Sequence, residues 1–338
     1  GTLLDPFNGK VDLIERRIRT PIDPIKTFTD DPLRMLRAVR FASQLDFSID
    51  PETLKGMQAC AERVSILSPE RIATEVNKTM ESPVPSVGLS WMYKGGLMPY
   101  ILPEVDALAG VDEVEGHLHK DNFWHTLEVV DNLSRVTPHI WDRWAALLHD
   151  IGKPPTKRFI KGTGWTFHGH EFLGGKMAKK IFKRLALPLD ERMQYVVKLV
   201  QMSSRPIAVA SDMATDSAVR RLLFDAGDAI DALMDLCEAD ITTKNPKKKE
   251  KYLGNFQKVR EKLVVVEARD HLRNWQPPVD GNQLMEWFGL APGREIGQLK
   301  ASIREAVLDG EIPNTFEAAR ELAYTSAIKM GITPKISK

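Results

Sequence analysis

Trp144-Ala-Ala-Leu-Leu-His149-Asp150-Ile-Gly-Lys-Pro154 is the segment from which the architecture of this 338-residue chain can be worked out. Its apolar residues predict a helix that ends in two adjacent metal-ligand types, His149 and Asp150, before a glycine and a proline. Burying these polar side chains costs free energy unless an ion or a hydrogen-bond network pairs them. An imidazole and a carboxylate placed together can hold a divalent ion with open coordination positions. Such an ion can activate water against phosphate esters.

Three further residues are of types that bind metals in proteins. His125 lies in Asn122-Phe-Trp-His-Thr-Leu-Glu-Val-Val130, where the apolar spacing predicts an amphipathic helix. His170 follows His168 and a glycine at a predicted helix start, and Asp240 closes an apolar stretch. Each residue alone has an ordinary interpretation, because a single such side chain more often packs or is solvated than binds a metal. The stronger signal is the ordered series, which is His125, His149-Asp150, His170 and Asp240.

The composition is that of an ordinary globular protein, with 43% hydrophobic and 28% charged residues, and the length allows two or three domains. No run of about 18 apolar residues occurs, so we expect no membrane-spanning helix. Cys60 and Cys237 lack the CxxC spacing and predict small apolar core residues in a reducing compartment, the cytoplasm. The net charge of +1 neither demands nor excludes a nucleic-acid partner, so RNA binding has to come from local basic patches.

Apolar spacing and turn residues predict a mostly α-helical chain with a short β remnant at its N-terminus. We expect two short strands around a turn at Asn8-Gly9, the second over residues 11–18, and a linker at residues 109–116. The first residues lack an initiator Met and indicate a fragment of a longer protein. Four segments are predicted, namely the N-terminal remnant, two helical blocks, and a long helix with a small helical tail, over residues 1–28, 29–108, 117–245 and 246–338.

A second pattern lies in Phe28-Thr-Asp-Asp-Pro-Leu-Arg-Met-Leu-Arg-Ala-Val-Arg-Phe-Ala42. Asp31 predicts the N-cap of a helix that begins at a proline, and Arg34 falls on the same helix face as Asp31. The ordinary interpretation is a cap with a surface ion pair. The alternative is that the carboxylate and the guanidinium together present acceptors and donors to a nucleobase edge. Arg37 and Arg40 follow at three-residue spacing and would extend a positive stripe toward phosphates.

Two other segments can receive phosphates. The first is a run of lysines between Thr242 and Tyr252, which comprises Lys244, Lys247, Lys248, Lys249 and Lys251. Such a run is usually a solvated surface, and the alternative is that it follows a phosphate backbone. The second is Pro292-Gly293 with Ile296-Gly297 at a predicted helix start, where the backbone N–H groups either receive a phosphate or belong to a plain cap.

The ligand series over residues 117–243 resembles the HD phosphohydrolase domain. The resemblance implies that one divalent ion (Mg, Mn, Ni, Co or Fe) is bound by four residues, which are His125, His149, Asp150 and Asp240. It also implies catalytic roles for three residues and phosphate contacts for two more, which are Asp150, Lys153 and His170, and then His168 and Arg205. Many members of that family carry a further histidine where this chain has Ser203. A hydroxyl is a poor transition-metal ligand, so we expect one ion rather than a stable pair.

The pattern at residues 28–42 resembles the helical neck of bacterial-type tRNA nucleotidyltransferases and poly(A) polymerases. An HD domain between neck and tail is a known arrangement in this family, so the two resemblances support each other. Four further segments are similar to the joint between the family's head and neck, to the neck, and to the tail, namely Asp5-Pro-Phe-Asn-Gly-Lys-Val-Asp12, Ser68-Pro-Glu-Arg-Ile72 with Glu75, and residues 292–297 and 308–311.

This second resemblance implies that Asp31 and Arg34 act as the protein template for an incoming nucleotide base, with Arg37 and Arg40 beside them. The implied partners are ATP, CTP and the 3′ end of tRNA or another RNA. The family's catalytic carboxylates lie in an N-terminal head, as an Asp-x-Asp pair with a Gly-rich sequence, and no such sequence occurs here. We therefore expect the chain as given to bind nucleotides poorly and not to transfer them.

Three functions fit the sequence. The first is a tRNA nucleotidyltransferase-family protein, CCA-adding or poly(A) polymerase-like, with a metal-dependent HD phosphohydrolase that acts on phosphate esters or RNA 3′ ends. The second is a non-catalytic RNA-binding module with a degenerate or structural HD metal site, which Ser203 favours. The third is a free-standing nucleotide phosphohydrolase, against which the arginine-bearing segment at residues 28–42 argues.

Overall fold

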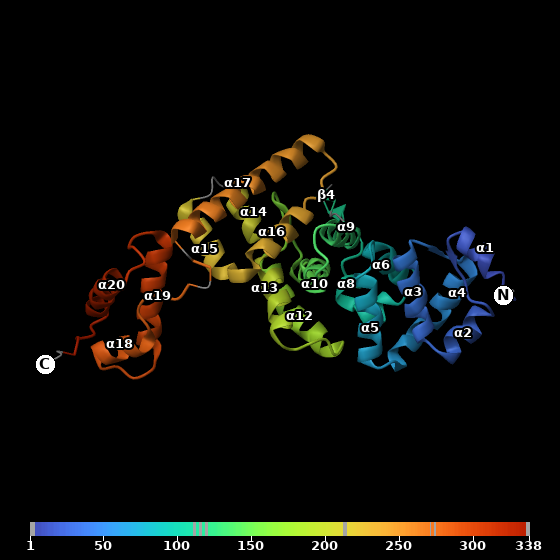
Figure 1. Ribbon diagram of the computed structural model, residues 1–338, viewed down its shortest axis with the longest axis horizontal. Helices are drawn as coiled ribbons and strands as arrows, with labels where there is room; N and C mark the ends of the chain where they lie inside the picture. The colour runs from blue at the N-terminus through green and yellow to red at the C-terminus, as the bar shows by residue number, and fades with distance from the viewer. Residues whose placement is uncertain are drawn as a thin grey trace. The chain divides into compact units, whose positions relative to one another are not determined.

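The computed structural model describes residues 4–110, 113–114, 117–118, 121–211, 215–270, 272–273 and 275–335. Over these residues the chain is mostly α-helical, as predicted, and its strands are only two or three residues long (Figure 1). The chain divides into two compact units. The first unit is Gly1–Ser204 with Ala232–Lys249, and the second is Arg205–Asp231 with Glu250–Lys338. All four predicted metal ligands therefore belong to the first unit.

The N-terminal segment differs from the prediction. Residues 11–18 do not form a strand, because α1 (Gly9–Ile14) is a helix and only β1 (Arg17–Ile18) is extended, paired in parallel with β2 (Ser48–Ile49). The Asp5 carboxylate accounts for the helix, since its oxygens accept the N–H groups of Gly9 and Lys10 at 2.6 and 3.0 Å. These N–H groups have no partner within a helix, and satisfying them outweighs the β propensity of the apolar residues that follow.

The neck, residues 29–108, is built of short helices, most of which begin at a proline. Proline suits this position because a helix gives its first N–H groups no partner. The Ser68 hydroxyl accepts the N–H of Arg71 and so caps the start of α5. The apolar face of one helix, α3, packs against α5 and α6 to form the core of the neck. Together with the preceding α2, the elements are α2 (Pro24–Asp30), α3 (Leu33–Leu45), α4 (Pro51–Cys60), η1 (Ala61–Ile66), α5 (Pro69–Met80), α6 (Pro85–Lys94), α7 (Met98–Ile101) and α8 (Pro103–Asp106).

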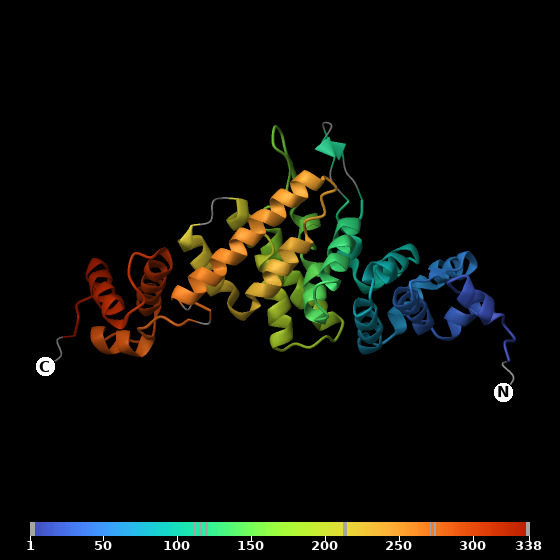
Figure 2. The same ribbon diagram turned by 45° about the horizontal axis from the view of Figure 1, so that its top comes forward.

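The second helical block surrounds the segment that contains His149 and Asp150. Helix α10 packs between α9 and α13, and its residues from Trp144 to Leu148 are completely buried. The helix ends at Leu148, as predicted, while Pro154 opens a further short helix instead of ending the helical structure. The elements are α9 (Asn122–Ser134), α10 (Ile140–Leu148), α11 (Lys153–Thr156), α12 (His170–Arg184), α13 (Glu191–Met202) and α16 (Ile230–Ala239) (Figure 2).

Two hairpins were not predicted. Strands β5 (Arg158–Ile160) and β6 (Gly164–Thr166) pair in antiparallel register, joined by a turn in which Gly162 and Gly164 both have positive φ. The alternation around Gly-Thr-Gly in the sequence is the signal that could have revealed this hairpin. The predicted linker overlaps a second short pair, β3 (Glu113–Val114) with β4 (His117–Leu118), while its residues 111, 112, 115 and 116 lie outside the described residues.

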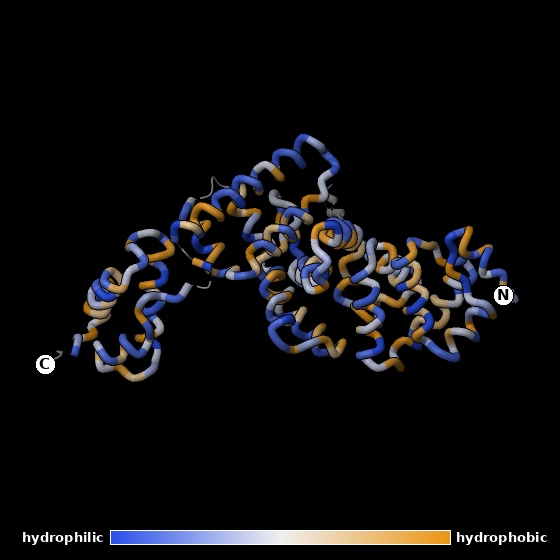
Figure 3. The backbone as a smooth tube through the Cα atoms, viewed as in Figure 1, coloured by the Kyte–Doolittle hydropathy of each residue, from blue (hydrophilic) through white to orange (hydrophobic). Residues whose placement is uncertain are grey.

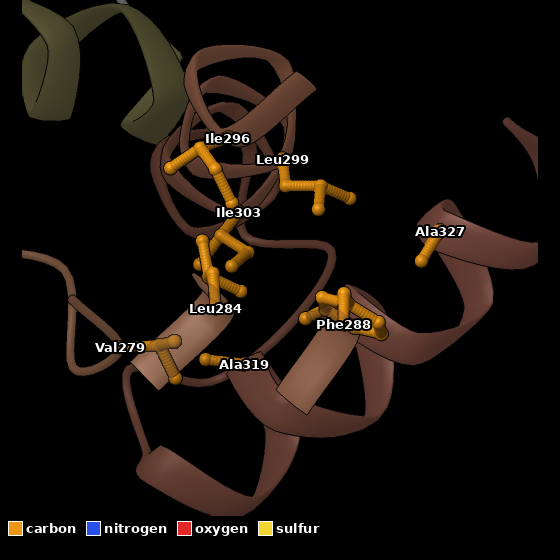
Figure 4. Packing of buried hydrophobic residues seen from close by; sticks show 9 residues of the cluster. Val279, Leu284, Phe288, Ile296, Leu299, Ile303, Ala319 and Ala327 are labelled. Carbon is orange, nitrogen blue, oxygen red and sulfur yellow. The ribbon is translucent and has the colours of Figure 1, made fainter. Parts of the chain in front are cut away.

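The second unit contains the predicted small helical tail at residues 280–330. Apolar side chains from α18, α19 and α20 meet in one core, of which Leu284, Phe288, Leu299 and Ile303 are labelled in Figure 4. The long helix predicted within residues 246–338 is confirmed as α17, which starts at Pro246 and ends at Asp270. The elements are α14 (Arg205–Ser211), α15 (Asp216–Ala226), η2 (Gly227–Ala229), α17 (Pro246–Asp270), α18 (Gly281–Phe288), α19 (Arg294–Asp309) and α20 (Phe316–Lys329).

A set of ion pairs, here called the ion-pair cluster, holds α15 to α17 and α19 in this unit. Asp216 contacts Lys262 and Arg269, and Arg221 contacts Asp309 at 2.9 Å. These pairs therefore join α15 to α17 and to the tail within the second unit. The cluster consists of Asp216, Arg220, Arg221, Lys262, Arg269, Asp270, Glu305 and Asp309.

Apolar and polar residues are interspersed along most of the helices, as in helices that pack on one side and face water on the other (Figure 3). Among the described residues, every helix is too short or too polar to cross a membrane. Both cysteines are buried and outside any disulfide, as small core residues would be.

Candidate metal centre

The four predicted ligands converge from three helices. His125 comes from the first turn of α9, His149 and Asp150 follow α10, and Asp240 follows α16. Asp240 Oδ1 lies 2.8 Å from His125 Nε2 and 3.6 Å from His149 Nε2. Asp150 Oδ2 lies 3.4 Å from His149 Nε2 and 4.0 Å from His125 Nε2. Four donor atoms from distant parts of the sequence therefore face one small volume.

Hydrogen bonds at Nδ1 orient the histidines. His149 Nδ1 donates to the carbonyl of Ala146 at 2.7 Å, so its Nε2 faces the carboxylates. His125 Nδ1 lies 2.9 Å from the Thr242 hydroxyl. A second partner of this kind fixes the ring orientation and the tautomer of a metal ligand. Thr242 was not predicted, because nothing in the sequence shows that a residue two positions after Asp240 reaches His125.

Two of the facing atoms are buried without a hydrogen bond to any described residue, namely His149 Nε2 and Asp240 Oδ1. The part of the centre formed by His149 and Asp150 is closed from water, since these residues are 3% and 2% exposed. A buried polar atom without a partner is costly. A divalent cation among these nitrogen and oxygen donors would satisfy both atoms, so the residues fit the metal that the sequence predicts. His125, His149 and Asp150 also bring one ligand atom each within 4.8 Å of one another.

The charges in the centre depend strongly on one another. Burial opposes the charged form of His149, but the adjacent carboxylates of Asp150 and Asp240 outweigh it and raise the pKa of His149 to about 10. Burial also opposes the Asp150 carboxylate, but attraction to His149 and Lys153 holds its pKa well below the usual range. For Asp240, attraction to the nearby imidazoles of His125 and His149 overcomes burial in the same way and lowers its pKa. The two carboxylates thus remain charged, and neighbouring imidazole and ammonium groups stabilise them.

Lys153 and His170 lie on opposite oxygens of Asp150. Lys153 Nζ is 2.6 Å from Asp150 Oδ2, whereas His170 Nε2 is 3.8 Å from Oδ1. Gly152 makes the second approach possible, because a Cβ there would lie 2.0 Å from the carbonyl oxygen of His170. Any side chain at this position would push the start of α12 away from Asp150. His170 also lies 3.3 Å from the carboxylate of Glu171, which sequence reasoning missed.

Three other predicted residues do not join this arrangement through any contact among the described residues. The His168 side chain is exposed. Arg205 belongs to the second unit and pairs with Asp225. Ser203 is buried, and its hydroxyl donates to the Val200 carbonyl at 3.0 Å, as serines at helix ends often do. The hydroxyl is therefore used inside its own helix end.

The nucleotide-binding residues predicted in the neck lie around α3. Asp31 precedes the helix, which begins at Leu33, and its carboxylate accepts the Leu33 N–H at 3.1 Å. This carboxylate lies 3.7 Å from the guanidinium of Arg71, at the start of α5. Arg34 is exposed, and its guanidinium donates to the Thr27 carbonyl at 3.4 Å. Asp31 thus faces Arg71, a residue of the second neck motif that was not among the predicted site residues.

Arg37 and Arg40 differ from each other in environment. Arg37 is exposed. Arg40 forms a 2.9 Å ion pair with Glu75 on α5, in which the side chains are only 13% and 6% exposed. The predicted positive stripe therefore ends at Arg37 on the surface, and Arg40 joins α3 to α5.

Two family models match the chain. The model of the HD domain matches residues 122–245, and a model described as the "probable RNA and SrmB-binding site of polymerase A" matches residues 46–108. Together with the helical fold and the His/Asp centre, these matches define the class: an HD domain joined to the RNA-binding region of a polymerase A-type protein.

Curated relatives identify the family within this class. The A-adding tRNA nucleotidyltransferase of Deinococcus radiodurans is 30% identical over 327 residues, which cover 94% of this chain and 73% of that protein. The chain belongs to the tRNA nucleotidyltransferase family, as the neck and HD motifs predicted. The multifunctional CCA protein of Shewanella frigidimarina is 36% identical over 68% of this chain and 54% of its own length. The chain spans little more than half the length of such relatives.

The fold is also that of a solved member of the family. The crystal structure of the Bacillus stearothermophilus CCA-adding enzyme in complex with CTP aligns with a TM-score of 0.61 and 21% identity. The alignment covers 98% of this chain and 71% of that one.

Proposed function

We propose that the His/Asp centre is a metal-dependent phosphohydrolase that acts on phosphate esters at RNA ends, within a protein that adds nucleotides to tRNA. One observation carries the first half. His149 Nε2 and Asp240 Oδ1 are buried without hydrogen bonds to described residues, and they face the same volume as His125 and Asp150. A folded chain keeps such groups when a ligand satisfies them.

The residues supply the parts of a hydrolytic reaction. His125, His149, Asp150 and Asp240 would hold the ion, which when bound supplies a Lewis acid for a phosphoryl oxygen and lowers the pKa of water. Hydrolysis forms one bond from water oxygen to phosphorus and breaks one ester P–O bond, and the departing oxygen gains a proton. Lys153 Nζ, beside Asp150, would offset negative charge on the phosphoryl oxygens. His170 Nε2, on the other side of Asp150, would carry the proton to the departing oxygen.

The nucleotide-adding half rests on family membership. Asp31, with its two acceptor oxygens, and the exposed Arg34 and Arg37 would contact ATP or CTP at the end of a tRNA. Arg40 would act indirectly, because its ion pair with Glu75 holds α3 against α5. The test is to join a relative's catalytic head to the chain and to replace Arg34 with Ala. The choice between ATP and CTP should change, and an unchanged choice would remove Arg34 from nucleotide recognition.

The hydrolase proposal is tested by adding Mn, Ni or Mg to the purified chain with a 2′,3′-cyclic nucleotide or a simple phosphomonoester. We expect metal-dependent turnover that Asp150→Ala abolishes. The matched control is Asp190→Ala, because Asp190 is an exposed aspartate that pairs only with Arg192 among the described side chains. Absence of turnover, or equal turnover by Asp150→Ala, would contradict the proposal.

A second candidate is a structural metal site in a non-catalytic RNA-binding module. It is favoured by Ser203, which stands where many HD domains have a further histidine. The Ser203 hydroxyl bonds within its own helix end, so fewer ligands remain for a second ion. This candidate predicts that metal raises the melting temperature of the protein without any turnover on either substrate.

A further inference from the structure

The connection that follows the metal centre carries four positive charges. Four of the five lysines that follow Asp240 and Thr242 are here called the lysine run, namely Lys244, Lys247, Lys248 and Lys249. Thr242 holds this connection to the centre through His125 Nδ1, and Asn132 Nδ2 on α9 donates to the Ala239 carbonyl at 3.0 Å. Figures 1 and 2 show the end of α16 passing beside α9 into the first turn of α17. Four extended residues span at most about 14 Å, so Lys244 lies within a few nucleotides of the centre.

The charges of the lysine run are free for an external partner. All four side chains are exposed, and over the described residues none has a carboxylate within 4.0 Å. The cationic side chains of the ion-pair cluster show the opposite arrangement, since Arg220, Arg221 and Arg269 each pair with carboxylates of their own unit. Among the described residues, the ion-pair cluster thus pairs its arginines with carboxylates, whereas the lysine run has no such partner.

The lysine run also stands at a position that folding alone disfavours. Lys247, Lys248 and Lys249 occupy the first turn of the 25-residue helix α17, which contains no acidic residue there. The positive end of the helix dipole repels these cations. The Asn245 side chain, by accepting the Lys248 N–H at 3.2 Å, is the group that caps the helix. The three lysines thus add positive potential where the backbone already contributes it, which suits a polyanion.

We propose that the lysine run is the specificity element of the metal centre and binds the backbone phosphates of an RNA strand whose terminal phosphate ester is hydrolysed. The proposal rests on the hydrolase function above and assigns the residues that hold the RNA strand, so that the centre prefers oligoribonucleotides to mononucleotides. RNA is favoured over an acidic protein because the run adjoins a centre built for phosphate chemistry. A mononucleotide is too short to reach the lysines, so it gains nothing from them.

The test compares two variants that remove the same charge. The first is Lys247→Gln/Lys248→Gln/Lys249→Gln at the start of α17. The matched control is Lys179→Gln/Lys180→Gln/Lys183→Gln, which removes three exposed lysines from the last turns of α12. The α17 variant loses cations from a helix start, so its melting temperature should stay the same or rise. Misfolding therefore cannot explain a loss of activity in that variant.

Each protein is assayed with a 2′,3′-cyclic mononucleotide and with an oligoribonucleotide that ends in a 2′,3′-cyclic phosphate. We expect the α17 variant to lose roughly ten- to hundredfold in kcat/KM on the oligonucleotide and to keep its mononucleotide activity. The slope of log KM against log salt should fall by about two for three lost phosphate contacts on a single strand. The α12 control should match the unmodified protein on both substrates.

The outcomes separate the two proposals. If the unmodified protein hydrolyses neither the mononucleotide nor the oligonucleotide, the hydrolase function fails and the specificity role fails with it. If the unmodified protein hydrolyses the oligonucleotide and the α17 variant keeps this activity, the lysine run is not the specificity element and an acidic protein becomes the better partner. An equal loss in both variants would mean general charge attraction, which also overturns the proposal.

Discussion

The metal centre and the ion-pair cluster of the second unit both gather acidic and basic side chains, but they satisfy them differently. In the cluster, Asp270 accepts from Arg220 and Arg269 at 2.7 Å, and Asp216 accepts from Arg269 at 2.9 Å. These side chains are 15% to 49% exposed. In the metal centre, Asp150 is 2% exposed, and two facing atoms lack a hydrogen bond to any described residue.

The difference teaches which charged groups serve a ligand. In ion pairs at the surface the two partners neutralise each other, and they contribute little to stability because water competes for both. A buried charge without a full set of partners is costly, and the fold retains it for what it binds. By this criterion the metal centre is a site and the ion-pair cluster is packing.

Removing one carboxylate from each region should give the largest contrast. Asp150→Asn leaves the buried His149 and the half-buried Lys153 without their shared counter-charge, so we expect a loss of about 3–5 kcal/mol in the free energy of unfolding. Asp216→Asn should cost less than about 1 kcal/mol. Urea denaturation in the presence of EDTA measures both. Similar losses would show that burial does not distinguish the two regions.

Added metal should stabilise the protein through the metal centre and not through the ion-pair cluster. Mn or Ni at a hundred times its Kd should raise the free energy of unfolding by about 2.7 kcal/mol after EDTA treatment. Asp240→Asn should remove this effect, since Asp240 Oδ1 faces both His125 and His149. Asp309→Asn in the ion-pair cluster should leave it intact. Thermal unfolding across a metal titration checks the prediction, and a shift that survives in Asp240→Asn would place the ion elsewhere.

The hydroxyl behind His125 should have a smaller effect than a ligand. Thr242→Val removes the partner of His125 Nδ1, so the ring loses its fixed orientation. We expect the affinity for metal to fall about 10- to 100-fold. Thr242→Ser keeps the hydroxyl and should retain nearly all of the affinity. If the valine and serine variants bind metal equally well, the hydrogen bond does not orient the ligand.

The sequence predicted that His125, His149, Asp150 and Asp240 would converge, because three of the four lie at helix ends that the sequence marks. The apolar run before His149, the glycine before His170 and the end of the apolar stretch at Asp240 are local signals, and the order of the series supplied the rest. Thr242 carries no such signal, since its contact joins residues 117 positions apart. Gly152 is similar, because only the approach of α12 explains why a side chain is not tolerated there.

Helix α3, which carries Arg34, Arg37 and Arg40, shows where residue spacing alone mispredicts a surface stripe. Residues three apart on a helix fall about 60° short of a full turn, so Arg40 lies about 120° around α3 from Arg34. That rotation is enough to bring Arg40 to Glu75 while Arg34 stays on the surface. The N-terminal strand was wrong for another reason, since the Asp5 carboxylate stabilises a helix start that apolar alternation cannot reveal.

The smallest expected effect is the pH dependence of the ion-pair cluster. The hydrogen bond from Arg269 lowers the pKa of Asp270 to about 2, against a small opposing effect of burial and from an ordinary value near 3.8. Because the folded pKa is the lower one, Asp270 stabilises the protein above about pH 4 and loses this contribution as the pH falls toward 2. Asp270→Asn should therefore cost less than about 1 kcal/mol at pH 6 and almost nothing at pH 2. Urea denaturation of both proteins at the two pH values measures this difference, and a cost that is the same at pH 2 would mean that Asp270 acts through packing rather than charge.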